Sequence, residues 1–363
     1  MSSIAPRKRV ALVAARNATE ADGIRDYTRR LLATLHQEEL DAELFEWTPG
    51  APNGGSGSQR SKLAAAELEA MDVLILQYEP FSFGRRGFAP GLALFLARLR
   101  RRRPRPLIAV MFHETYVDMK NLRWTLMGGW QRAQLVAIQA AADVQLCSIQ
   151  RWTERLRKTA LGRPVHHLPV ASNLPDARAH RSRIRRSLNA DADTIVLSCM
   201  GLRHPGRLAQ EVLASAREAG TVARSVLLLD LGPGVSSATS LAENVELRAT
   251  GFLPAEDLAG HIAASDVFLA PYMDGVSTRR TSVMAALQHG VPVVGTTGHL
   301  TDDVFLRSRD LILVPPDRLV PAVTRLVGEP ASRARLGAAG RRLYEASFDW
   351  PVLVQRLRSH LDV

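Results

Sequence analysis

Short apolar runs alternate with helical patterns along the whole chain. Each run is about one strand long, and the segments between them carry apolar residues at helical spacing. This alternation is typical of repeated βα units, and it predicts parallel sheets covered by helices. In the first half, strands are expected at Arg9–Ala15, Ala42–Trp47, Val73–Gln77, Leu107–Phe112, Val144–Ser148 and Val165–Leu168. Helices are expected there at Asp26–Gln37, 92–103 and Trp130–Ala141.

A second series of apolar runs follows a polar, arginine-rich stretch from Asp176 to Asp193. Its expected strands are Ile195–Met200, Val226–Asp230, Val245–Ala249, Val267–Ala270 and Val291–Gly295. Because 363 residues are too many for one ordinary compact domain, we expect two, comprising residues 1–175 and 176–346. Each is expected to be a Rossmann-like, doubly wound α/β domain. A ligand would bind at the carboxyl ends of the strands, in a cleft between the domains.

The composition of the chain limits the cellular compartment and the charge of the partner, but it does not identify the ligand. The net charge of +11 implies an anionic partner, although heavy use of Arg could equally reflect a GC-rich genome. No basic stripe interleaved with aromatic residues occurs, so nucleic acid is not expected. The start of the chain, Met1–Arg9, lacks a signal-like apolar region, and no apolar run reaches the roughly 18 residues of a spanning helix. We therefore expect a cytoplasmic protein, with a peripheral position on the inner membrane face as the alternative.

The two cysteines and one glycine-rich segment add smaller expectations. Cys147 and Cys199 each lie in an apolar run, where buried free thiols of a reducing compartment are expected. The segment Pro49–Ser58 is a flexible loop by composition, and no helix start with Lys-Ser or Lys-Thr follows it.

The segment Gly251–Thr297 carries the strongest indication of a site. A helix, Ala255–Ala264, leads to a buried strand, Val267–Ala270, and then to a loop before a helix whose start is marked by Thr281 and Ser282. A Gly-, Ser- and Thr-containing loop at a helix N-terminus offers backbone N–H groups and the positive end of the helix dipole, which favour a phosphate. The residues expected to bind it are Asp274, Gly275, Val276, Ser277, Thr278, Arg279, Arg280, Thr281 and Ser282. The same pattern also fits a capped surface helix with two solvated arginines.

This segment resembles the donor-binding region of retaining glycosyltransferases with the GT-B fold, and more narrowly the bacterial group 1 family. The shared order is a helix, Ser-Asp, a strand ending in Pro, the phosphate loop, a small-residue helix and then Gly290-Val291-Pro292-Val293. Similar strand-end motifs occur in the first half, at Gln77–Pro80, Phe112–Glu114 and Leu168–Asn173. Phe348-Asp349-Trp350 resembles the start of the segment that returns to the first domain, so residues 347–363 are expected to pack there.

The resemblance implies a metal-independent glycosyltransferase that moves a sugar from a nucleotide-diphosphate sugar to an acceptor hydroxyl with retention of configuration. The donor would be a UDP- or GDP-sugar, and no other cofactor is expected. The acceptor would be a glycan, a glycolipid or a secondary metabolite. The second domain would bind the nucleotide sugar, and the first would face the acceptor. The run Arg100–Arg103 ends a helix, where a solvated face is expected and weak contact with an anionic membrane is the alternative.

One departure from the family pattern concerns the donor sugar. Many relatives carry two glutamates around the phosphate loop and its helix, and those positions fall near Ser277 and Ala285, neither of which is acidic. Asp274, or the backbone around Gly275 and Val276, could substitute. The missing glutamates keep open a catalytically silent sugar-nucleotide-binding partner protein. A GT-B nucleotide-sugar epimerase is a further alternative.

His113 is the second site candidate, because it directly follows the strand Leu107–Phe112 and such a position points into the ligand crevice. The resemblance implies that it contacts the donor sugar near the reacting carbon, whereas a His that caps the next loop is the alternative. Gly23 lies in the loop Ala18–Tyr27 after the first strand, where the family contacts phosphate or acceptor. An isolated Gly is also commonly just a turn.

Arg203 and Arg207 follow the strand Ile195–Met200, and the resemblance makes both eligible to contact the donor phosphates. Either could equally be a solvated surface arginine. We assign His113, Arg203 and Arg280 to the catalytic step. Gly23, Arg207 and the other phosphate-loop residues are assigned to donor binding.

No metal site is expected. Asp191-Ala-Asp193 matches the Asp-x-Asp of metal-dependent glycosyltransferases of another fold, but it precedes a strand instead of following one. His166 and His167 are adjacent, so on a strand they face opposite ways and cannot share a metal ion.

Overall fold

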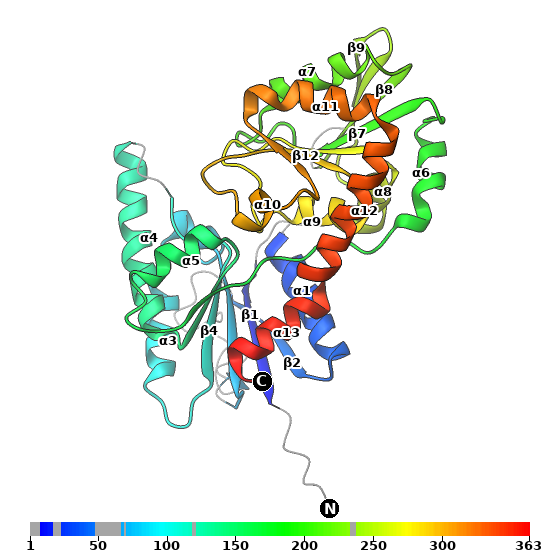
Figure 1. Ribbon diagram of the computed structural model, residues 1–363. Coiled ribbons are helices and arrows are strands. Elements are labelled where there is room, and N and C mark those ends of the chain that lie inside the picture. The colour runs from blue at the N-terminus through cyan, green and yellow to red at the C-terminus, as the bar shows by residue number, and fades with distance from the viewer. Residues whose placement is uncertain (1–7, 17–22, 48–66, 69, 118–120, 233–236) are drawn as a thin grey trace, which may run out of the picture. The chain divides into compact units, whose positions relative to one another are not determined.

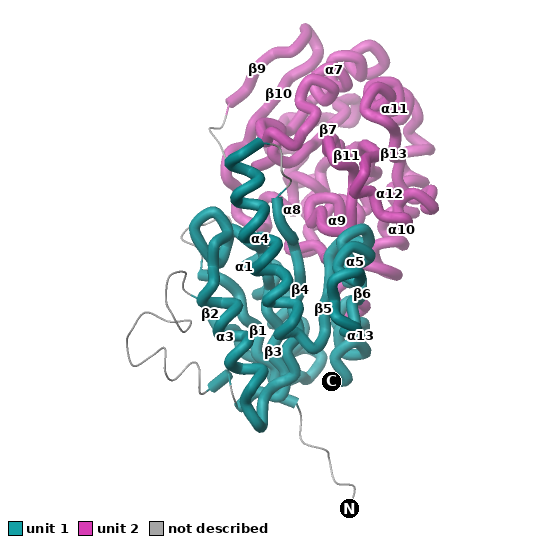
Figure 2. The backbone as a smooth tube through the Cα atoms, turned by 90° about the vertical axis from the view of Figure 1, so that its left-hand side faces the viewer, with its two compact units in different colours: residues 1–169, 353–363 teal, residues 170–352 magenta. Residues whose placement is uncertain are grey.

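A computed structural model of the protein describes residues 8–16, 23–47, 67–68, 70–117, 121–232 and 237–363. The expected loop Pro49–Ser58, most of Met1–Arg9 and positions 18–22 lie outside these ranges. The chain forms two compact units: unit 1 comprises residues 1–169 and 353–363, and unit 2 comprises residues 170–352 (Figure 2). Each unit is a β-sheet covered by helices (Figure 1). Both belong to the expected α/β class.

Unit 1 contains a six-stranded parallel sheet in the order β2-β1-β3-β4-β5-β6. Its strands are β1 (Arg9–Ala15), β2 (Asp41–Trp47), β3 (Val73–Tyr78), β4 (Leu107–Phe112), β5 (Val144–Cys147) and β6 (Val165–His167). Because β2 and β3 flank β1 on opposite sides, the strand order reverses at β1. Such a reversal is where doubly wound domains bind ligands, at the carboxyl ends of the strands.

Helices cover this sheet so completely that β3 is buried on both faces. They are α1 (Gly23–Gln37), α3 (Pro90–Arg100), α4 (Leu122–Ala141), α5 (Gln150–Arg157) and α13 (Trp350–Leu361), with short 3₁₀ turns η1 (Pro80–Ser82) and η2 (Arg85–Gly87) after β3. Helix α13 follows unit 2 along the chain, yet from Leu353 onward it belongs to unit 1.

Unit 2 contains a seven-stranded sheet in the order β13-β12-β11-β7-β8-β10-β9. Its strands are β7 (Thr194–Met200), β8 (Ser225–Leu231), β9 (Ser237–Ala242), β10 (Val245–Ala249), β11 (Val267–Ala270), β12 (Val293–Thr296) and β13 (Ile312–Val314). The pairs are parallel except that β9 runs antiparallel to β10 at one edge. The order reverses at β7, between β8 and β11, so the loops after β7 and β11 share the switch point.

The helices of unit 2 are α6 (Arg181–Ser187), α7 (Ala209–Ala219), α8 (Ala255–Ala264), α9 (Thr281–Gln288), α10 (Asp303–Arg307), α11 (Leu319–Gly328) and α12 (Pro330–Ser347), with 3₁₀ turns η3 (Arg178–His180) and η4 (Pro316–Arg318). The core of this unit combines β7, β8 and β11 with the inner faces of α7 and α11.

Several expected boundaries were wrong. Helix α4 starts at Leu122 instead of Trp130, because its first turns carry exposed apolar residues and so lack the periodicity of a buried face. Helix α3 ends at Arg100, so most of the Arg100–Arg103 run lies beyond it. The expected strand Val291–Gly295 is β12, which starts at Val293, after Pro292. Strand β9 was not expected at all, because its residues are mostly small and almost entirely exposed.

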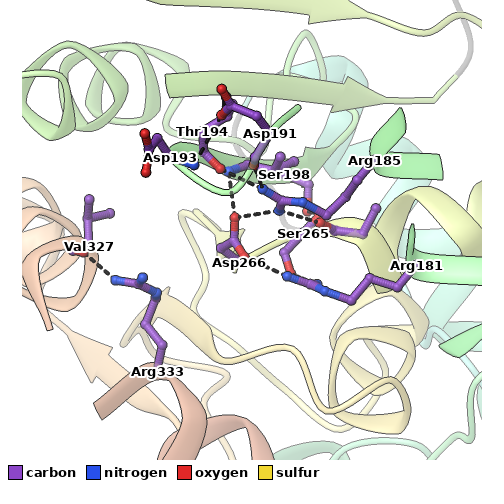
Figure 3. A network of polar contacts seen from close by, with 12 residues as sticks. Arg181, Arg185, Asp191, Asp193, Thr194, Ser198, Ser265, Asp266, Val327 and Arg333 are labelled. Atoms are coloured by element: carbon purple, nitrogen blue, oxygen red, sulfur yellow. Dashed lines mark hydrogen bonds and ion pairs between the residues drawn. The ribbon is translucent and has the colours of Figure 1, made fainter. Parts of the chain in front are cut away.

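The amino ends of β7 and β11 are joined by a partly buried carboxylate, that of Asp266, which accepts from the Val196 amide (Figure 3). Asp266, just before β11, accepts hydrogen bonds from Arg181 Nη2 at 2.6 Å and Arg185 Nη1 at 2.8 Å. Asp191 Oδ1 accepts from Thr194 Oγ1 at 2.6 Å and so stabilises the turn before β7. The acidic residues at this end therefore have structural partners.

Candidate functional site

The loops that follow β7 and β11 meet at the switch point of unit 2. The Leu208 amide donates to the Pro271 carbonyl at 2.9 Å, and the Met273 amide donates to the Gly206 carbonyl at 3.1 Å. An isolated antiparallel bridge between Arg207 and Tyr272 lies between these two bonds. The two loops are thus joined by backbone pairing, which fixes Arg207 beside the first residues after β11.

The ring of Tyr272 lies against two guanidinium groups. Arg207 Cζ lies 4.0 Å from the ring centroid and Arg280 Cζ lies 4.1 Å from it. Tyr272 is only 1% exposed, and its hydroxyl forms a 2.6 Å hydrogen bond with Ser282 Oγ. Cation–π attraction of this kind stabilises each positive charge by about 1 kcal/mol or more when water is excluded. The ring therefore lets two like charges lie close together.

One carboxylate partly balances these charges. Asp274 Oδ2 accepts from Arg279 Nη2 at 2.7 Å and from Arg280 Nη2 at 2.7 Å. Burial pushes the pKa of Asp274 upward, but the charges of Arg280 and Arg279 outweigh it and hold the pKa below its ordinary value. Burial lowers the pKa of Arg280, and the nearby charge of Arg279 adds to that effect. With Arg207, the cluster contains three guanidinium groups against one ionised carboxylate, so it favours an anion.

The amides of the phosphate loop are arranged differently from our expectation. The Gly275 amide donates to Tyr272 O at 3.1 Å, the Val276 amide to Thr296 O at 2.9 Å, and the Thr278 amide to Asp302 Oδ2 at 2.7 Å. Three of the expected phosphate-binding amides are therefore used within the protein. The sequence could not reveal this, because Thr296 and Asp302 come from the next strand and the next helix cap.

Other groups in the loop remain available to a ligand. Ser277 Oγ is buried and has no hydrogen-bond partner among the described residues. Thr281 and Ser282 open α9, so their amides have no carbonyl to reach within the helix. The residue before them, Arg280, makes no side-chain cap, although we expected a capped start. The helix therefore presents its first amides and the positive end of its dipole beside the arginine cluster.

Gly275 is required by the path of this loop. Its φ of +89° is in the left-handed region, and a Cβ there would lie 2.2 Å from Thr301 Oγ1 and 2.4 Å from the Gly298 amide nitrogen. Only glycine allows this approach of the two backbones. The loop is consequently anchored to the segment after β12 instead of forming a free turn.

Arg203 differs from its neighbour Arg207 in its surroundings. Its side chain is exposed on the turn after β7, and it makes no hydrogen bond or ion pair with any part of the chain that the structure describes. Arg207, by contrast, is half-buried, and its Nε donates to the Met200 carbonyl at 3.1 Å. The structure thus brings Arg207 into the cluster and leaves Arg203 at its exposed margin.

In unit 1, His113 lies at the carboxyl end of β4 as expected. Its Nε2 lies 2.8 Å from Gln77 Oε1 of β3, and its ring meets that of Tyr27 edge-on at 5.1 Å. His113 is 9% exposed. Gln77 is a polar residue in an otherwise apolar strand, and this could have singled it out in the sequence.

Gly23 is the first residue of α1, so residues 23–27 are helical and not part of the loop we expected. A Cβ at this position would meet no atom within 4 Å, so packing does not demand a glycine. Tyr27, one turn further along α1, links this helix to His113.

Metal-ion clusters and membrane-spanning helices are both absent from the residues that the structure describes. No group of three or more His, Cys, Asp or Glu residues in the described ranges is placed to bind a metal ion. Within the same ranges, no helix combines the length and apolar character needed to cross a bilayer.

Comparison with known proteins places these observations in context. Residues 195–329 match the family model described as glycosyl transferases group 1. A GDP-mannose-dependent monoacylated alpha-(1-6)-phosphatidylinositol monomannoside mannosyltransferase of Corynebacterium glutamicum is 28% identical over 258 residues, which is 66% of this chain and 66% of that protein. The match thus spans just under two thirds of that relative's length.

Solved structures are similar over nearly the full chain. Sucrose-phosphate synthase from Thermosynechococcus elongatus has a TM-score of 0.70 at 16% identity and covers 97% of this chain and 98% of its own. HepE from Anabaena, in complex with UDP and glucose, has a TM-score of 0.64 at 13% identity and covers 98% of this chain and all of its own (100%). At these identities the likeness concerns the fold.

Proposed function

We propose that the chain transfers a sugar from a nucleotide-diphosphate sugar to an acceptor hydroxyl with retention of configuration, because residues 195–329 match the group 1 glycosyltransferases and the fold is GT-B. Unit 2 binds the donor, and unit 1 carries the acceptor side. The observation that supports this assignment best is the arginine cluster around Tyr272, at the switch point of unit 2. A diphosphate is the part of the donor that such a cluster recognises.

The cluster would act chiefly on the leaving group. Departure of the nucleotide leaves negative charge on the diphosphate, and Arg207 and Arg280 lie where they can stabilise it, together with the first amides of α9. Ser277 Oγ, buried without a partner among the described residues, is a further donor for a phosphate oxygen. We also assign Arg203 to this step, as the exposed cation of the same loop.

Retention needs the acceptor to approach from the side on which the diphosphate departs. In our proposal the leaving phosphate itself takes the acceptor's proton, so that no protein carboxylate is required as the base. His113 contacts the donor sugar near the reacting carbon, and its pairing with Gln77 holds the imidazole in place. No metal is required, because the guanidinium groups supply the positive charge.

Donor and acceptor follow from the relatives only as proposals. The Corynebacterium glutamicum relative is named for GDP-mannose, and HepE was solved with UDP and glucose, so we propose a GDP- or UDP-sugar as the donor. We propose a glycan, a glycolipid or a secondary metabolite as the acceptor. The protein would then work in the cytoplasm, with weak contact to the inner membrane face if its acceptor is a lipid.

The donor sugar itself must be recognised in an unusual way. Ser277 and Ala285 stand where many relatives have glutamates, and Asp274 is already paired with two arginines. This departure favours a second candidate function, a sugar-nucleotide-binding partner protein without catalytic activity.

Substitution of Arg280 tests the proposal. Arg280→Ala should weaken GDP or UDP binding and lower turnover about 100-fold, because the leaving phosphate loses a buried cation. Isothermal titration and donor hydrolysis in the absence of acceptor would measure the two effects. Arg217→Ala, which removes an exposed arginine on α7, is the matched control and should behave as the parent protein.

A wider screen separates the candidate functions. Thermal-shift assays with UDP-, GDP-, ADP- and dTDP-sugars should reveal stabilisation by at least one donor. Stabilisation with slow hydrolysis supports a transferase, whereas stabilisation without any turnover supports the binding protein. Release of an epimerised sugar would instead indicate an epimerase. If none of the sugars stabilised the protein, or if Arg280→Ala bound the nucleotide as well as the parent, the donor-site assignment would be wrong.

A further inference from the structure

Unit 2 contains a cavity that lies apart from the proposed donor site. It has a volume of about 760 Å³ and is lined by β13, α11 and α12. None of the residues assigned to the donor or to catalysis lines it. The cavity is therefore separate from the site of the proposed glycosyl transfer.

The floor of the cavity is apolar. Ile312 and Val314 lie on the same face of β13 and line the cavity together with Ala322 of α11 and Leu336 of α12. All four pack against the core of unit 2 but are only partly buried. Apolar surface in a concave site gains free energy when a ligand removes it from water. The floor thus favours an alkyl or aryl group.

The rim of the cavity is strongly cationic. It carries four arginines against the single carboxylate of Glu329: Arg309, Arg325, Arg335 and Arg342. That carboxylate already accepts from Arg325 Nε at 3.0 Å and from Ser332 Oγ at 2.8 Å. Arg309 and Arg342 form no ion pair with any residue in the described ranges. Two guanidinium groups on the rim are thus available to an anion.

From these two features we propose that the cavity binds a single-chain anionic amphiphile, with its alkyl chain on the β13 floor and its anionic head between Arg309 and Arg342. A bare anion would leave the floor exposed, and a neutral alkyl compound would leave the charges unmatched. The volume of the cavity lies within the roughly 300–1,000 Å³ that is typical of small-molecule sites. A protein partner would instead need a complementary surface of about 800 Å². A small amphiphile therefore fits better than a second protein chain.

Monomeric dodecyl phosphate, used below its micelle-forming concentration, is a suitable probe. Calorimetric titration of the full chain should show saturable binding to one site, accompanied by a rise in Tm. Inorganic phosphate and dodecanol each represent half of the probe, and each should bind at least about tenfold more weakly. Equal binding of dodecanol, or a fall in Tm with no saturation, would overturn the proposal.

Variants locate the binding within the cavity. Arg309→Gln combined with Arg342→Gln should weaken dodecyl phosphate binding about tenfold, because both charge-assisted contacts are lost. Ala322→Leu, which fills the floor with a good helix former, should weaken it as well without removing charge. Arg217→Gln on α7, which removes an exposed arginine outside the cavity, is the control and should bind as the parent does. Unchanged binding by both the paired arginine variant and Ala322→Leu would refute the assignment.

Two further measurements exclude other occupants. Vesicles of phosphatidylglycerol and phosphatidylcholine should bind the protein through Arg309 and Arg342 no more strongly than monomeric dodecyl phosphate does. Sedimentation velocity should show no concentration-dependent association that Ala322→Leu abolishes. Vesicle binding without binding of the monomer would assign the cavity to a membrane surface, and Ala322→Leu-sensitive association would assign it to a second copy of the chain. Either result would contradict the proposal.

Discussion

At the scale of single residues, Tyr272 lies at the centre of the proposed donor site. Its ring contacts both Arg207 and Arg280, and its hydroxyl is bonded to Ser282 at the start of α9. Two guanidinium groups so close together would otherwise repel each other, and burial of Arg280 already lowers its pKa. The ring thus brings arginines from two loops that are far apart in sequence into one cluster, which we propose binds the donor diphosphate.

Replacing Tyr272 separates its ring from its hydroxyl. Tyr272→Leu should weaken GDP or UDP binding about tenfold, because two cation–π contacts are lost. Tyr272→Phe keeps the ring and should lose much less. Titration calorimetry of both variants with GDP or UDP measures which of the two binds the nucleotide more weakly. A Phe variant as weak as the Leu variant would show that the hydroxyl, not the ring, is what matters.

Gln77 acts on His113 in a comparable way, since its Oε1 lies 2.8 Å from the imidazole Nε2 within the protein interior. Gln77→Leu should lower kcat by roughly tenfold or more, because His113 loses the contact that orients it. The Kd for the donor nucleotide should change little, since in our proposal the diphosphate is bound by unit 2. Gln145→Leu is a control at another buried glutamine, on β5. If the Kd rose while kcat stayed constant, Gln77 would have a different role.

At the scale of elements, much of the fold could be predicted because βα units carry strong local signals. Strand β11 and helix α8 begin and end where we expected, since a buried apolar run and a periodic helix face are both readable locally. Helix α4 was misplaced at its start because Leu122 and Leu126 are apolar yet exposed. Strand β9 escaped prediction because it pairs with β10 while only one of its residues, Leu241, packs against the core.

The candidate site was predictable to the level of the loop but not to the level of its contacts. The position of Arg280 after β11 follows from a local pattern. That Arg207 shares an aromatic ring with it does not, because the pairing depends on two loops that meet only in the folded sheet. The Thr278 amide was likewise expected to bind phosphate, because the sequence does not show that it donates to the distant Asp302.

The close approach of Gly275 to Gly298 gives a prediction about the loop as an element. Gly275→Ala should lower the free energy of unfolding by about 3 kcal/mol, because it combines a positive φ with a backbone clash. Donor binding should fall with it. Gly328→Ala, at a position where a Cβ meets nothing within 4 Å, should be neutral or slightly stabilising. Urea unfolding of the two variants measures the contrast, and equal effects would contradict it.

At the scale of the whole molecule, helix α13 is bound to unit 1 through a histidine pair. The rings of His166 on β6 and His360 on α13 stack with centroids 4.0 Å apart and an interplanar angle of 15°. Burial lowers the pKa of both; the charge of Arg157 adds to this for His166, and the charges of His166 and Arg356 add to it for His360. The folded protein therefore prefers both rings neutral.

A pH dependence follows from the direction of these shifts. Because the folded-state pKa values are depressed, the stabilisation is complete above the ordinary histidine pKa of about 6.5 and is lost as the pH falls below it. Urea midpoints measured at about pH 7.5 and about pH 5 should therefore differ less in His360→Phe than in the parent. His299→Gln changes an exposed histidine and should leave the difference unaltered. An identical pH dependence in His360→Phe would refute the role of the pair.

The return of α13 to unit 1 also has a consequence for how the protein is made. Unit 2 is inserted within unit 1 along the chain, since residues 353–363 follow residues 170–352. During synthesis all residues of unit 2 are therefore added before residues 353–363 of unit 1. Domains generally fold as they emerge, so the later unit in sequence can finish folding first. A chain truncated after residue 352 would contain every residue of unit 2, together with a unit 1 that lacks His360 and the rest of residues 353–363.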